Sequence, residues 1–189
     1  MSFYAGIDPG KEGAIAVLDE NGAVVSLWDL SDPGFRPFLT HTISIMRIAL
    51  AALEEVHSFP RQGVASMFSI GRALGRCEEM LEGRGIPYQL VPPQRWQAFF
   101  HLAHARRSVK GKPLTKKEKA ARRLAHKQRI LEFAQRRWPT AELHGPQGGR
   151  KFGRADALVL AEYARVTHLG LVAAEKGGIP KCPSPSSEP

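Results

Sequence analysis

Apolar residues near the start of the chain fall into short runs that are separated by polar or glycine-containing turns. The first run, Phe3–Ile7, ends at Asp8-Pro9-Gly10 and predicts a buried strand. The next two runs, Ala14–Leu18 and Ala23–Leu27, flank Asp19-Glu20-Asn21-Gly22, which is typical of a hairpin turn. The sequence therefore predicts three consecutive antiparallel strands.

Helical spacing becomes frequent further along the chain. Three segments have the apolar periodicity of amphipathic helices: Pro60–Gly83, Lys119–Trp138 and Ala155–Val166. The segment from Pro37 to about Met46 is also compatible with a helix, and Gly145–Gly149 with a loop.

Two shorter segments complete the expected sheet. Tyr88–Val91 predicts a short strand, because it is apolar and is followed by Pro92-Pro93. Ile48–Val56 is ambiguous, since its alanines favour a helix while its position between chain breakers allows a buried strand. Strands followed by alternating helices and strands predict a mixed α/β sheet.

The length and composition indicate one domain. The chain has 189 residues with 43% hydrophobic residues, enough for a single core over residues 1–172, and a Pro-Ser tail at 173–189 that we expect to be disordered. No apolar run reaches the roughly 20 residues needed to cross a bilayer. The start of the chain has no secretory leader, and Cys77 and Cys182 do not make a disulfide framework. We expect a cytoplasmic protein.

The net charge of +9 comes from one block of the chain. Between His101 and Arg137 there are thirteen basic and two acidic residues, a local net charge of +11. Such a block suits a phosphate backbone, and the alternative is a solvated, flexible loop. Gly111 and Pro113 predict that residues 101–118 form a mobile basic loop.

Three acidic residues stand out by their location. Asp8 ends the first apolar strand, Glu54 lies inside the apolar stretch Ile48–Val56, and Asp156 lies in the opening turn of the last helix. Each alone could be a turn, surface or helix-start acid. Clustered carboxylates repel one another unless a divalent cation neutralises them, so the three together suggest a metal site.

The motifs around these acids resemble those of the RuvC-type Holliday-junction resolvases, in the RNase H-like superfamily. Gly6-Ile7-Asp8-Pro9-Gly10 resembles their opening motif, and Leu53-Glu54-Glu55-Val56 their second, which selects Glu54 rather than Glu55. The run from Phe59 to Gly75 resembles the bacteriophage branch, and Gly153–Leu158 the last motif. The resemblance covers roughly residues 3–166.

This resemblance implies an RNase H-like fold with a central five-stranded sheet flanked by helices. It implies a structure-selective endonuclease that resolves four-way DNA junctions as a homodimer making paired nicks. Two Mg²⁺ ions roughly 4 Å apart would act on the scissile phosphate, with Mn²⁺ able to substitute. Asp8 would bridge both ions, and Glu54 and Asp156 would each complete one side.

The sequence departs from this family at one position. Many relatives have a further Asp or His about one helical turn before the final acid, where this chain has Phe152 and Gly153. A fourth ligand is therefore missing, replaced by water or supplied elsewhere, with His144 a weak candidate. Lys151 is a candidate catalytic residue facing the attacking water or the phosphate, and its alternative reading is a surface cation.

The resemblance and the basic block also suggest DNA-contacting residues. Phe59 is the candidate wedge for the junction centre, whereas Phe68, at helical spacing, is expected in the core. The other predicted DNA contacts are all basic: Arg61, Arg106, Arg107, Lys110, Lys112, Lys116 and Lys117.

Three other functions share some of these features. Actin-like ATPases and sugar kinases begin with a similar motif but need two such domains, and 189 residues do not accommodate them. An RNase H-like nuclease for RNA or flaps would have the same fold and metals. A non-catalytic junction-binding protein would retain the basic block and lose the metal site.

Overall fold

The protein forms a five-stranded mixed sheet in the order β3-β2-β1-β4-β5. The structure, a computed structural model, describes residues 1–10, 12–32, 43, 46–57, 63–103 and 115–175. The strands are β1 (Phe3–Asp8), β2 (Ala14–Asp19), β3 (Val24–Asp29), β4 (Ile48–Glu54) and β5 (Tyr88–Val91). β1, β2 and β3 pair antiparallel, whereas β1–β4 and β4–β5 are parallel. The predicted sheet of three antiparallel strands followed by parallel strands is confirmed.

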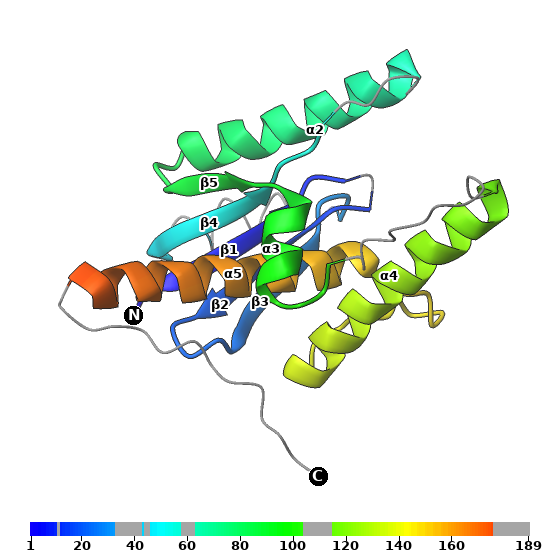
Figure 1. The fold of residues 1–189 in the computed structure, drawn as a ribbon. Helices are drawn as coiled ribbons and strands as arrows, with labels where there is room; N and C mark the ends of the chain where they lie inside the picture. The colour runs from blue at the N-terminus through cyan, green and yellow to red at the C-terminus, as the bar shows by residue number, and fades with distance from the viewer. Residues whose placement is uncertain (11, 33–42, 44–45, 58–62, 104–114, 176–189) are drawn as a thin grey trace, which may run out of the picture.

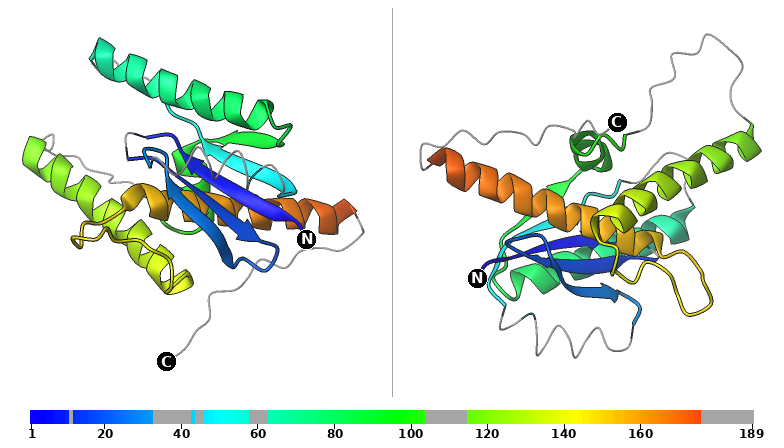
Figure 2. Two further views of the ribbon diagram at one scale, coloured as in Figure 1. Left: turned by 180° about the vertical axis from the view of Figure 1, so that it is seen from behind. Right: turned by 90° about the horizontal axis from the view of Figure 1, so that it is seen from below.

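Helices cover both faces of this sheet. α5 (Phe152–Glu175) crosses one face, with α3 (Pro93–Phe99) and α4 (Lys116–Arg137) beside it, and α2 (Val64–Glu82) lies on the other side (Figures 1 and 2). Each face has its own hydrophobic cluster, one built around α5 and the other around the C-terminal end of α2. The central strands are buried on both faces, which explains their nearly continuous apolar sequence.

The close approach of α5 to β1 depends on a glycine. A Cβ atom at Gly6 would overlap the backbone of Ala157 and Ala161 in α5. Glycine is therefore required at this position of the first motif, because no side chain fits between strand and helix. This contact places the beginning of α5 over the end of β1.

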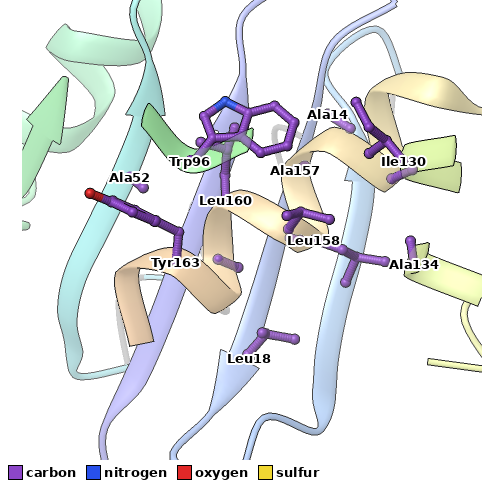
Figure 3. Close-up of a cluster of buried hydrophobic side chains, with 14 of the residues drawn as sticks. Ala14, Leu18, Ala52, Trp96, Ile130, Ala134, Ala157, Leu158, Leu160 and Tyr163 are labelled. Atoms are coloured by element: carbon purple, nitrogen blue, oxygen red, sulfur yellow. The ribbon is translucent and has the colours of Figure 1, made fainter. Parts of the chain in front are cut away.

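The core on the α5 face joins residues from all the main elements. Figure 3 shows Trp96 of α3 and Tyr163 of α5 packed beside Leu160, with Leu158 and Ile130 further along the cluster. Every residue from Ala157 to Ala164 in α5 is buried. Burying this surface supplies the main favourable contribution to folding.

Several predicted elements need correction. Ile48–Glu54 is a strand, which settles the ambiguous segment, and α3 was not predicted. α4 begins at Lys116, where Thr115 and Glu118 form a capping box, so residues 116–118 belong to a helix rather than to the predicted loop at 101–118. α5 extends beyond the expected 155–166 and past residue 172.

Other predictions fall outside the described residues. They concern most of the possible helix at 37–46, the start of the 60–83 helix, the loop residues 104–114 and the tail after Glu175. Within the described part of the chain, no helix has the length and apolar character required to span a membrane.

Candidate functional site

Three carboxyl groups gather at one edge of the sheet. Asp8 is the last residue of β1 and Glu54 the last residue of β4. These strands are parallel neighbours with Ile7 opposite Leu53, so both acids stand at the same edge. Asp156 lies near the start of α5, which is packed over β1; an added Cβ at Gly153 would lie only 3.2 Å from Asp8 Oδ2.

The electrostatics indicate that the three groups act on one another. Burial raises the pKa of Glu54 to about 7, and the charge of Asp8 adds to this shift. Burial raises the pKa of Asp156 well above its usual range, with Asp8 and Glu54 contributing further. Burial also raises the pKa of Asp8. A second charge at such a site is unfavourable until a cation joins it.

The loop after β1 holds Asp8 in place. The backbone N–H of Gly10 donates to Asp8 Oδ1 at 2.8 Å, and the Gly13 N–H donates to the Gly10 carbonyl at 2.9 Å. A side chain at Gly153 would overlap the Glu12 carbonyl on this loop. Position 153 therefore has no room for a side chain that could supply a further ligand.

Sequence reasoning missed two groups beside the acids. The charge of Lys127, on α4, lowers the pKa values of Asp8, Glu54 and Asp156, and its Nζ lies 5.4 Å from the centre of the Phe152 ring. The indole Nε1 of Trp96 donates to Glu54 Oε1 at 3.1 Å. Lys127 was visible only as one cation within a basic block, and nothing in the sequence marked Trp96.

Lys151 lies in a separate ionic cluster. Its Nζ is 3.0 Å from Asp29 Oδ2, and Arg154 Nε donates to Asp29 Oδ1 at 2.8 Å. Burial alone would raise the pKa of Asp29, but the hydrogen bonds from Arg154 and Lys151 outweigh it and lower that pKa. Lys151 and Asp29 also line an open pocket of about 470 Å³ that includes Glu12.

A divalent cation matches the donor chemistry of the acids. Carboxylate oxygens are the ligands that Mg²⁺ and Mn²⁺ prefer. Among the described residues, no three His, Cys, Asp or Glu side chains converge closely enough to hold a metal ion.

The other predicted site residues have different outcomes. Phe68 is 69% exposed on α2, so the expectation that it is buried is wrong. His144 is exposed and pairs with Arg150 in an isolated β-bridge. Lys116 and Lys117 are exposed in the first turn of α4. The remaining predicted contacts lie outside the described residues: Phe59, Arg61, Arg106, Arg107, Lys110 and Lys112.

Comparison with known proteins supports the fold. No family model and no curated protein matches the sequence. The chain is similar to the structure of Thermus thermophilus RuvC in complex with a Holliday junction substrate, with 19% identity, a TM-score of 0.54 and coverage of 94% of this chain and 97% of that one. It is also similar to another Thermus thermophilus RuvC structure, with 19% identity, a TM-score of 0.51 and coverage of 93% and 96%. The chain therefore has the RNase H-like fold of RuvC.

Proposed function

We propose that this protein is a divalent-metal-dependent endonuclease that resolves four-way DNA junctions. The observation that supports this most is the meeting of Asp8, Glu54 and Asp156 at one sheet edge, where burial raises all three pKa values and the charge of Asp8 adds to the shifts of Glu54 and Asp156. The likeness to a RuvC that was solved with a junction substrate supports the choice of substrate.

The three acids are the proposed metal ligands. Asp8, Glu54 and Asp156 would together supply the carboxylate oxygens that hold the divalent ions. Divalent ions held there would activate water for attack and stabilise the leaving 3′ oxygen. The protein's own contribution is to hold the carboxylates on rigid strand and helix ends.

Two lysines are the proposed phosphate contacts near the acids. Lys127 acts on all three carboxyl groups, and a cation there would also attract the phosphate that enters the site. Lys151 would reach a phosphate only by leaving Asp29, whose carboxylate Arg154 still binds. This exchange would keep Asp29 paired throughout.

The basic face of α4 is the proposed path of the DNA backbone. In the C-terminal half of α4, the face that packs against the rest of the domain carries the buried Ile130, Leu131 and Ala134. By helical periodicity, the same face in the N-terminal half carries Lys116, Lys119, Arg123 and Lys127. These four residues, named here the α4 basic face, are exposed and lead to the acids.

A homodimer through α2 is also proposed. Val64, Phe68, Gly71 and Gly75 form one stripe on α2, separate from the stripe that packs on the sheet. Val64 is 79% exposed and Phe68 69% exposed, and no atom of the described residues lies within 4 Å of a Cβ built at either glycine. A second copy on this face would bury the stripe. The resulting dimer would contain two sets of acids, one from each copy.

Cleavage of a synthetic four-way junction tests the proposed function. We expect Mg²⁺- or Mn²⁺-dependent cleavage of the junction, with little cleavage of linear duplex or of an RNA–DNA hybrid. Asp8→Asn should abolish cleavage and leave junction binding unchanged or tighter, because it removes a metal ligand and one negative charge that repels phosphate.

The other outcomes identify the competing functions. Preferred cleavage of the hybrid or of a flap would assign another RNase H-like activity. Tight junction binding without cleavage in either metal would indicate a non-catalytic binding protein. Normal turnover of Asp8→Asn with Mg²⁺ would show that the acids are not the active site.

A further inference from the structure

Trp96 lies at the edge of the sheet that carries the acids because of the way β5 continues into α3. Glu54 is paired with Val91, so β4 and β5 end side by side. After Pro92, α3 begins at once, and Trp96 follows within its first turn. The ring is 1% exposed, and its Nε1 donates to Glu54 Oε1 at 3.1 Å.

The indole is held firmly in this position. Trp96 packs in the cluster around α5, beside Leu160, as Figure 3 shows. An indole N–H can donate a hydrogen bond but cannot accept one, so it requires an acceptor such as a carboxylate oxygen. It engages Oε1 of Glu54, and the second carboxylate oxygen stays available to another partner.

We propose that Trp96 is a positioning residue that fixes the Glu54 carboxylate for divalent-cation binding. The inference rests on the proposed role of Glu54 as a metal ligand. A glutamate side chain has several free torsions, and ordering it when the cation arrives would weaken binding. A buried donor that holds the carboxylate beforehand removes much of this cost, as partners of metal ligands commonly do.

The two other tryptophans provide matched controls. Trp138 is also buried, and its Nε1 donates to the Gly22 carbonyl at 2.8 Å, away from the acids. Trp28 donates to Ser26 Oγ at 2.8 Å. Replacing Trp138 by Phe therefore removes an indole hydrogen bond from the core without touching Glu54.

Calorimetric titration with MnCl₂ compares the two substitutions in the full chain. Trp96→Phe keeps an aromatic ring but removes the donor, and we expect Mn²⁺ affinity to fall about 10–100-fold. Trp138→Phe should lower thermal stability and leave Mn²⁺ affinity unchanged. Wild-type affinity in Trp96→Phe, with normal cleavage, would overturn the inference and leave the proposed function standing.

Fluorescence provides a second test that keeps Trp96 intact. In the Trp28→Phe/Trp138→Phe protein, Trp96 is the remaining tryptophan of the three in the chain. Its emission should change on addition of MgCl₂, and adding Glu54→Gln should remove that change. Constant emission while calorimetry detects bound metal would overturn the inference. Absence of metal binding and of cleavage in the wild type would instead remove the proposed function, and the inference with it.

Discussion

At the residue scale, the two adjacent glutamates Glu54 and Glu55 have different surroundings. Glu54 lies among the acids and accepts a hydrogen bond from Trp96. Glu55 is partly exposed and forms an ion pair with His57 at 3.4 Å. We predict that Glu54→Gln lowers the rate of junction cleavage by at least about 10²-fold, similar to the effect of removing other preorganised electrostatic groups. Glu55→Gln serves as the control and should be close to wild type, and the reverse order would assign the wrong glutamate.

The raised pKa of Glu54 leads to a pH-dependent stability. In the metal-free folded protein this pKa is about 7, against 4.5 for an ordinary glutamate. Between these values only the folded state holds the proton, so the stability due to Glu54 is full below pH 4.5 and is lost as pH rises toward 7. A difference of one pH unit in pKa is worth about 1.4 kcal/mol, so the free energy of unfolding should decrease by about 3 kcal/mol over this range of pH.

Urea unfolding in EDTA at a series of pH values measures this effect. The free energy of unfolding of the wild type should fall, relative to that of Glu54→Gln, between pH 5 and 7.5. Adding MgCl₂ should restore more stability at pH 8 than at pH 5, because the cation requires the ionised carboxylates. Parallel curves for the two proteins would contradict the prediction.

At the element scale, Gly153 fixes how α5 meets the loop after β1. We predict that Gly153→Ala destabilises the protein by about 1–3 kcal/mol, because its Cβ would overlap the Glu12 carbonyl. The shift of α5 should also displace Asp156 and reduce cleavage. Thermal unfolding and a junction-cleavage assay measure the two effects. Gly149→Ala is the control, since in the described part of the chain no atom lies within 4 Å of a Cβ built there. Equal stabilities of the two variants would contradict this account.

The α4 basic face predicts a strong dependence of DNA binding on salt. Replacing Lys116, Lys119 and Arg123 by Ala should flatten the slope of log affinity against log salt by about one unit for each phosphate that the protein no longer neutralises. Junction-binding titrations between about 50 and 200 mM salt measure this slope.

The matched control for the α4 basic face lies on the opposite side of the helix. Replacing Arg122 and Arg136 by Ala removes two positive charges from that side, against three from the α4 basic face, and should change the slope less for each charge removed. Equal changes in slope per charge removed would mean that α4 has no preferred face for DNA.

The sequence predicted those elements whose apolar residues follow a clear local pattern, and it did not predict those without one. The alternating and continuous apolar runs predicted β1, β2 and β3. Ile48–Glu54 was ambiguous because a strand buried on both faces has no period-two pattern. α3 has only seven residues, too few to show a helical period.

The structure brings the three predicted acids to one edge of the sheet, and their role as a functional site stays a prediction. Asp8, Glu54 and Asp156 are far apart in sequence, and only the pairing of β1 with β4 and the packing of α5 bring them together. Trp96 and Lys127 reach the same place by tertiary packing that no local pattern encodes. Phe68 was misassigned to the core because an apolar residue at helical spacing can also lie on a second, exposed face.

At the scale of the whole molecule, the N-terminal halves of α2 and α4 both project past the sheet at the edge where β1 and β4 end (Figures 1 and 2). The acids therefore lie between the N-terminal half of α2, which carries the apolar stripe, and that of α4, which carries the α4 basic face. A basic helix suits the DNA backbone, whereas an apolar stripe in water suits a protein partner. This division agrees with the proposed roles of α4 in DNA binding and of α2 in self-association.

The α2 stripe provides the last prediction. A dimer interface needs roughly 800 Å² on each partner, and a central exposed aromatic is the usual anchor of such a surface. Phe68→Asp places a charge in the middle of the stripe, so the protein should become monomeric by sedimentation while remaining folded, since Phe68 is 69% exposed. Ser69→Asp adds the same charge at an exposed position about 100° further round α2, outside the stripe, and should leave a dimer through the stripe intact. On a cruciform plasmid, we expect paired nicks from the wild type and single nicks from the Phe68→Asp monomer, because each monomer carries one set of acids. A dimeric Phe68→Asp protein that still makes paired nicks would place the dimer interface elsewhere.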